Sequence, residues 1–145
     1  MNQATRSDLG LLILRLMIGA VFVFHGAGKL FGWFGGYGIE GTAGFFESLG
    51  IPFPVLSVLL AGGAEFFGGL LLIAGFGVRL IAAPLAFTML VGAITAHGGA
   101  FSAQAGGMEY PLTLAVAAAA LGLLGPGRFS FAPRFSSERQ LATSA

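Results

Sequence analysis

Long apolar stretches, each closed by glycine, are the main pattern along this chain. There are four of them, over Leu9–Phe31, Val55–Gly75, Val78–His97 and Glu109–Leu124. A helix needs about 20 mostly apolar residues to cross a bilayer, and only the last stretch is clearly shorter. Because the apolar residues form continuous runs of this length, the pattern predicts an all-α integral membrane protein, a four-helix bundle over residues 9–131.

The basic residues predict the orientation of the bundle. If residues 1–8 are cytoplasmic, that side also carries the arginines at positions 79, 128, 134 and 139, whereas the other side carries Lys29 beside three glutamates. Such an asymmetry favours cytoplasmic N- and C-termini. The polar residues 132–145 then form a flexible cytoplasmic tail. Arg15 and Lys29 interrupt the first stretch and no cleavage site follows, so it is expected to be retained rather than removed as a signal peptide.

The outer loop over residues 32–54 is long and aromatic. Thr42 is placed to cap a short helix through Leu49, with Gly50 and Pro52 after it. Such a helix could lie at the membrane surface, or the aromatic residues could form a belt that only anchors the bundle.

Composition narrows the function. Only 9% of the 145 residues are charged, against roughly 25% in soluble domains. Disordered proteins, ordinary soluble enzymes and nucleic-acid binders are therefore excluded, the last also because the net charge is only +1. The chain has no cysteine, which excludes disulfide, thiolate and iron–sulfur chemistry as well as cysteine-bound zinc.

Charged residues inside the spans are the most informative positions, because a charge in the membrane is costly unless it is paired. At 100° per residue, the first span has one stripe that holds Arg15, Gly19, Phe22, Gly26 and Lys29. The second span has a face that holds Ala61, Glu65, Gly68, Gly69 and Leu72. We therefore expect Arg15 and Glu65 to form an ion pair, which either fixes the helix register or contacts a proton or a quinone.

A second polar cluster is expected towards the outer side. It would bring together His25, Lys29, His97, Glu109 and Tyr110. Histidine titrates near neutral pH, so this cluster could exchange protons; alternatively, its members are interfacial side chains that reach for water. Zinc held by His25, His97 and Glu109, or a haem held by the two histidines, is not favoured, because these residues lack any short ligand spacing.

The same residues resemble those of the DoxX family. The resemblance rests on Arg15, the segment 23–31 with His25 and Lys29, the glycine-rich run 62–72 around Glu65, then Arg79, His97 and the segment 125–130. It covers residues 9–131 and departs at Phe131-Ala132, where the family usually has Leu-Asp. It implies a multi-pass inner-membrane protein. The family is named after a subunit of a thiosulfate:quinone oxidoreductase, which points to membrane redox chemistry by analogy.

We therefore expect a quinone-linked redox component or a membrane subunit of an oxidoreductase, with quinone as a non-covalent cofactor. The expected catalytic residues are His25, Lys29, Glu65 and His97, and the expected substrate-binding residues are Arg15, Phe22, Phe66, Arg79, Glu109 and Tyr110, with Phe24 and Phe67 as further walls. Because no electron carrier is evident, a soluble or membrane redox partner is expected, and a homo-oligomer is possible. Two alternatives remain open, a small transporter and a structural assembly partner.

Overall fold

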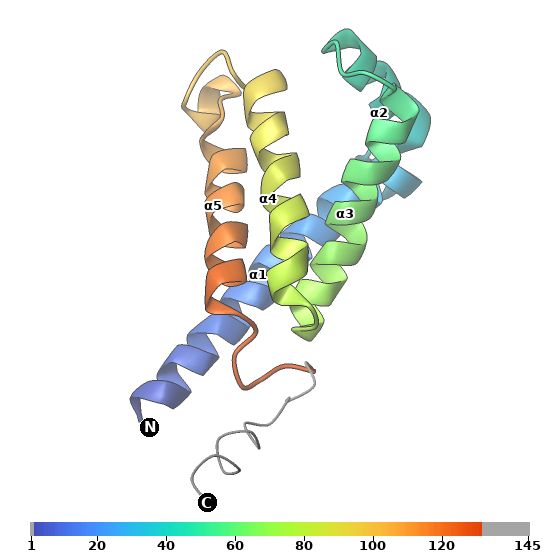
Figure 1. Ribbon diagram of the computed structural model, residues 1–145. Coiled ribbons are helices and arrows are strands. Elements are labelled where there is room, and N and C mark those ends of the chain that lie inside the picture. Colours follow the sequence, from blue (N-terminus) through green and yellow to red (C-terminus); the bar gives the residue numbers. More distant parts are fainter. Residues whose placement is uncertain (1, 132–145) are drawn as a thin grey trace, which may run out of the picture.

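A computed structural model describes residues 2–131 (Figure 1). Over these residues the chain is all-α, with five α-helices and two short 3₁₀ turns: α1 (Gln3–Phe31), η1 (Trp33–Gly35), α2 (Gly38–Ser48), α3 (Pro54–Ala74), α4 (Val78–Thr95), η2 (Ala103–Ala105) and α5 (Glu109–Leu124). Within this part of the chain α1, α3 and α4 are long and apolar enough to cross a membrane, and α5 is a shorter apolar helix. The predicted all-α class is confirmed, and each of the four apolar stretches forms a helix.

The helix boundaries differ from the predicted ones by more than one residue at two places. Helix α1 begins at Gln3, six residues before Leu9, because the side chain of Asn2 accepts a hydrogen bond from the backbone N–H of Thr5 at 2.9 Å. Helix α4 ends at Thr95, two residues before His97.

The two ends of the bundle carry different charges. The N-terminus, the α3–α4 turn and the C-terminal end of α5 lie at one end (Figure 1), which carries Arg6, Arg79 and Arg128. We call it the arginine end. The opposite end, which we call the lysine end, holds the end of α1 after Lys29, α2 and the α4–α5 loop. The predicted charge asymmetry is thus present in the fold.

Glycines bring α1 and α3 into backbone contact. A Cβ atom on Gly19 would lie 2.7 Å from the carbonyl oxygen of Gly69, and one on Gly26 would lie 2.8 Å from that of Gly62. The two glycines on α1 are seven residues apart, and so are the two glycines on α3. The contacts therefore recur on one face of each helix. Small residues allow this close approach in membranes, and α1–α3 is the largest helix interface, followed by α4–α5.

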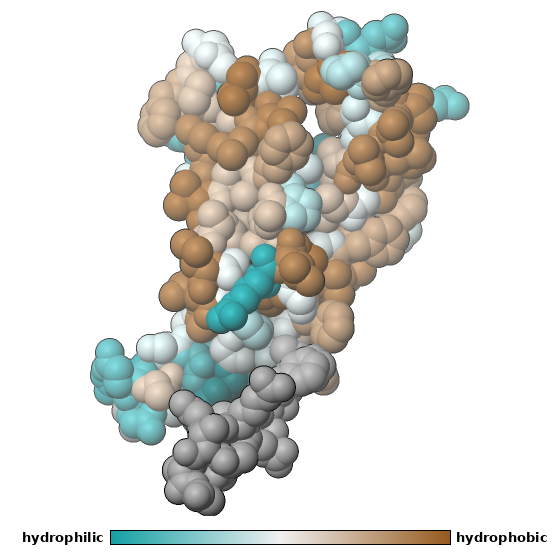
Figure 2. All heavy atoms as spheres, viewed as in Figure 1, coloured by the Kyte–Doolittle hydropathy of each residue, from teal (hydrophilic) through white to brown (hydrophobic). Residues whose placement is uncertain are grey.

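The core lies where these two helix pairs meet. It contains Phe22, Leu72, Val78, Leu85, Leu114, Ala118 and Leu121, all buried. Many other large apolar side chains are exposed, and Figure 2 shows them along the length of the molecule, with hydrophilic residues mainly at its ends. In a bilayer these side chains would contact lipid rather than water.

The loop over residues 32–54 contains α2, so the predicted short helix exists, but the predicted cap is wrong. Helix α2 begins at Gly38, and Thr42 is buried inside it, 6% exposed. Gly38, four residues before Thr42, adopts a left-handed φ of 64°, which lets the chain turn into the helix earlier than a threonine cap would. Gly50, with φ 73°, follows the end of the helix as predicted.

Candidate functional site near the lysine end

A buried ion pair joins α1 to α3. The ammonium nitrogen of Lys29 donates a hydrogen bond to Oε2 of Glu65 at 2.6 Å. The Glu65 side chain is 2% exposed, whereas that of Lys29 is 24% exposed. The Glu65 carboxylate is therefore shielded by protein, and the Lys29 ammonium is the more accessible member of the pair.

Aromatic rings form a continuous series around this end of α1. From α5 towards α3, neighbouring ring centroids lie 4.9–6.3 Å apart along Tyr110, His25, Phe24, Phe34, Trp33, Phe31, Phe66 and Phe67. We call these eight residues the aromatic series. Phe24 and Phe34 are stacked at 4.9 Å with an interplanar angle of 15°. Both rings are about half exposed or more, 48% and 64%, and so present flat apolar faces outward.

His25 and Tyr110 connect α1 to α5. The hydroxyl of Tyr110 lies 3.5 Å from Nε2 of His25, a long contact at the limit of a hydrogen bond. His25 and Lys29 are one turn apart on α1, so this contact lies near the ion pair. Four of the seven residues expected in the cluster or the ion pair thus occupy one region: His25, Lys29, Glu65 and Tyr110.

The remaining members of the predicted outer cluster have other surroundings. Nδ1 of His97 lies 2.8 Å from the carbonyl oxygen of Gly106, which ties the end of α4 to the α4–α5 loop. Glu109 begins α5 and lines a shallow groove with Phe101 and Leu112. Among residues 2–131, no group of three or more histidines and acidic residues is arranged to hold a metal ion.

The expected ion pair between Arg15 and Glu65 is wrong. Arg15 is buried, 1% exposed, but Nη1 donates to the carbonyl oxygen of Pro126 and Nη2 to that of Phe129. The segment after α5 folds back under the bundle and offers these acceptors, so the guanidinium points towards the arginine end. Arg15 lies about 20 Å from Lys29 along α1, given 14 residues at 1.5 Å each. The structure therefore contains two separate polar sites rather than one.

The other predicted binding residues are distributed over the whole bundle. Phe22 is fully buried in the core, whereas Phe66 belongs to the aromatic series. Arg79 is exposed in the first turn of α4, and its guanidinium lies beside Gly125. Sequence reasoning missed the acceptor role of Pro126 and Phe129. The signal available was the segment Gly125-Pro126-Gly127, which ends the helix and frees backbone carbonyls.

Comparisons with known proteins identify the family. Residues 10–98 match the family model described as DoxX. The protein named "Putative oxidoreductase CatD" of Bacillus subtilis is 37% identical over 87 residues, which cover 60% of this chain and 58% of that protein. The chain thus spans less than two thirds of the length of the Bacillus protein.

Two relatives come from Escherichia coli. "Inner membrane protein YphA" is 30% identical over 103 residues, covering 67% of this chain and 69% of that protein. "Inner membrane protein YqjF" is 28% identical over 125 residues, covering 85% and 89%. No solved structure matches the chain. The family match, these relatives and three candidate spans make this a multi-pass inner-membrane protein, and the chain belongs to the DoxX family.

Proposed function

We propose that this protein is a quinone-reactive membrane component of an oxidoreductase. The observation that carries the proposal is the pairing of a shielded carboxylate, Glu65, with a partly exposed ammonium, Lys29, next to the aromatic series. The printed name of the Bacillus relative, an oxidoreductase, supports the reaction class.

The side chains at this site fit a quinone. A quinone needs an apolar contact for its ring and polar hydrogens for its two oxygens. Exposed rings of the aromatic series, such as Phe24 and Phe34, offer the apolar contact to a molecule arriving from the bilayer. Lys29 offers charged donors, and His25 with Tyr110 offers a neutral pair.

When bound, a quinone would accept two electrons and two protons and leave as the quinol. The electrons would come from a redox partner protein, because the chain has no cysteine for an iron–sulfur cluster and carries no evident electron carrier. Lys29 would stabilise negative charge at the ring oxygen nearest to it. As a carboxylate, Glu65 would neutralise the Lys29 ammonium between turnovers, and that ammonium would hold the first of the two protons. His25 and Tyr110 would hold the second proton.

We also infer that the arginine end faces the cytoplasm, in accordance with the distribution of Arg6, Arg79 and Arg128. The proposed quinone site would then lie in the outer half of the bilayer.

Binding can be tested with the native fluorophore. Trp33 is the only tryptophan and belongs to the aromatic series, with its ring centroid 5.0 Å from that of Phe31. A short-chain quinone added to the protein in nanodiscs should quench Trp33 fluorescence saturably. Lys29→Met should weaken this quenching about tenfold, which corresponds to the loss of one hydrogen bond to a charged group.

Arg79→Met is the matched control, since it removes a cation at the opposite end of the bundle. Glu65→Gln should preserve binding but slow quinol formation in membranes that contain the redox partner. Quenching that does not saturate, or that is equal in the Lys29→Met and Arg79→Met variants, would refute the proposal. Proton or ion flux into liposomes without quinone would instead favour a transporter.

A further inference from the structure

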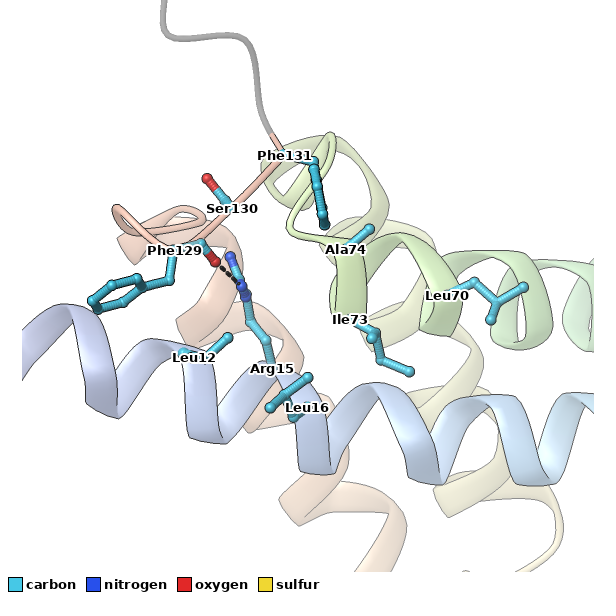
Figure 3. A pocket seen from close by; sticks show the side chains of 9 residues that line it. All are labelled: Leu12, Arg15, Leu16, Leu70, Ile73, Ala74, Phe129, Ser130 and Phe131. Carbon is cyan, nitrogen blue, oxygen red and sulfur yellow. Dashed lines mark hydrogen bonds between the residues drawn. The ribbon is translucent and has the colours of Figure 1, made fainter.

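A groove of about 480 Å³ opens beside Arg15 near the arginine end (Figure 3). Its walls are apolar side chains of two helices, Leu12 and Leu16 of α1 and Leu70 and Ile73 of α3. Phe131 closes one side, and its backbone N–H donates to the carbonyl oxygen of Ala74 at 3.0 Å. The groove lies at the opposite end of α1 from the proposed quinone site.

The charge of Arg15 is not balanced within residues 2–131. Its two hydrogen-bond acceptors, the carbonyl oxygens of Pro126 and Phe129, are neutral. The ion pairs in this part of the chain are Lys29–Glu65 and Arg128–Asp8, and neither includes Arg15. Its Nε is buried and has no hydrogen-bond partner among the described residues. A buried cation without a counter-charge is costly, so the surroundings of this groove favour an anion.

The two properties of the groove define one class of ligand. An apolar wall suits a hydrocarbon chain, and an uncompensated cation next to it suits a negative charge. We propose that the groove binds one anionic phospholipid, with an acyl chain against Leu12, Leu16 and Leu70 and the phosphate at the mouth beside Arg15. A free phosphate ion would leave the apolar walls without a partner.

Lipid quenching of a tryptophan placed at the groove tests this assignment. The reporter is Phe131→Trp in a Trp33→Phe background, which keeps an aromatic side chain at the groove. The protein is reconstituted in vesicles of phosphatidylcholine and phosphatidylglycerol, with brominated chains on one lipid at a time. Phosphatidylglycerol should bind at the reporter about fivefold more tightly than phosphatidylcholine, as expected for the attraction between one arginine and an anionic headgroup.

Phe87→Trp in the same background is the control. Phe87 is 65% exposed on α4, eight residues beyond Arg79 and away from the arginine end, and should show a ratio of about one, as for bulk lipid. Arg15→Gln should reduce the preference for phosphatidylglycerol at the Phe131→Trp reporter. Ala74→Phe fills the groove without changing the charge, and it should reduce the same preference. The second variant keeps the test valid if Arg15→Gln does not fold.

Equal quenching by the two lipids at the reporter would overturn the proposal. So would a preference that appears only after Glu138→Gln, since a carboxylate of residues 132–145 would then be the natural partner of Arg15. Inorganic phosphate that abolishes the preference at millimolar concentration would show that a free anion, not a lipid, is the ligand.

Discussion

The ammonium of Lys29 lies 2.6 Å from Oε2 of Glu65, where it joins the last turns of α1 to the middle of α3. Glu65 is about 16 Å from the start and about 14 Å from the end of its helix, counted at 1.5 Å per residue. The pair therefore connects α1 and α3 within the apolar part of the bundle. Each charge offsets the cost of burying the other.

Removing one partner should destabilise the fold more than removing both. Lys29→Met leaves a buried carboxylate without its cation and should lower the free energy of unfolding by about 3 kcal/mol. The double variant Lys29→Met with Glu65→Leu should recover most of this loss, because no charge remains buried. Unfolding by SDS titration in mixed micelles measures both. If the single and double variants lose equal stability, the pair does not hold the helices together.

The glycine contacts between α1 and α3 predict a position-specific effect of one methyl group. A Cβ atom on Gly69 would lie 2.7 Å from the carbonyl oxygen of Gly19, which belongs to a helix backbone and cannot move aside. Gly69→Ala should therefore destabilise the protein by about 1–3 kcal/mol.

Gly63→Ala on the same helix is the control, since nothing lies within 4 Å of its added Cβ atom. Its stability should remain within about 0.5 kcal/mol of the original. Equal losses in the two alanine variants would show that the α1–α3 contact does not set the effect, because alanine by itself favours a helix over glycine.

Arg15 should hold the segment after α5 in place. Its guanidinium donates to the carbonyl oxygens of Pro126 and Phe129, on both sides of the exposed Arg128. Arg15→Gln removes these charged donors, so trypsin should cut after Arg128 several-fold faster, as seen by mass spectrometry of the fragments. Arg6→Gln, at the exposed start of α1, should leave the rate unchanged. A cut after Arg128 that is equally slow in both variants would contradict this role.

The orientation of the bundle can be checked with single cysteines, because the chain has none of its own. Tyr37→Cys and Gln104→Cys lie in exposed loops at the lysine end, whereas Gln3→Cys lies at the exposed start of α1. A membrane-impermeant maleimide should label the first two in intact spheroplasts and the third only after permeabilisation. The reverse pattern would place the arginine end outside.

The helices could be predicted from the sequence because a continuous run of about 20 apolar residues is a strong signal for a membrane helix. The buried face of each helix followed from the helical periodicity of 100° per residue. Arg15, Gly19, Phe22 and Gly26 are all buried on α1, and Glu65, Gly68, Gly69 and Leu72 are all buried on α3, as expected. The start of α1 could not be placed, since the polar residues before Leu9 give no apolar signal and the cap at Asn2 is a single side chain.

The partner of Glu65 could not be predicted for a different reason. Helical faces show which residues turn inward but not how far one helix is shifted along another. The backbone contacts at Gly19 and Gly26 fix that shift between α1 and α3, and they bring Lys29 rather than Arg15 to Glu65. The acceptors of Arg15 are backbone carbonyls in an irregular segment, which have no residue-type signature.

The bonds from Arg15 to Pro126 and Phe129 span 111 and 114 residues of sequence. During synthesis, the guanidinium enters the membrane long before the ribosome has made the carbonyl groups that will solvate it. Until those carbonyl groups are made, the charge is best solvated if the side chain reaches towards the bilayer surface, where water is available. A polypeptide that stops before residue 126 would lack both acceptors and would carry an unsatisfied cation within its first helix.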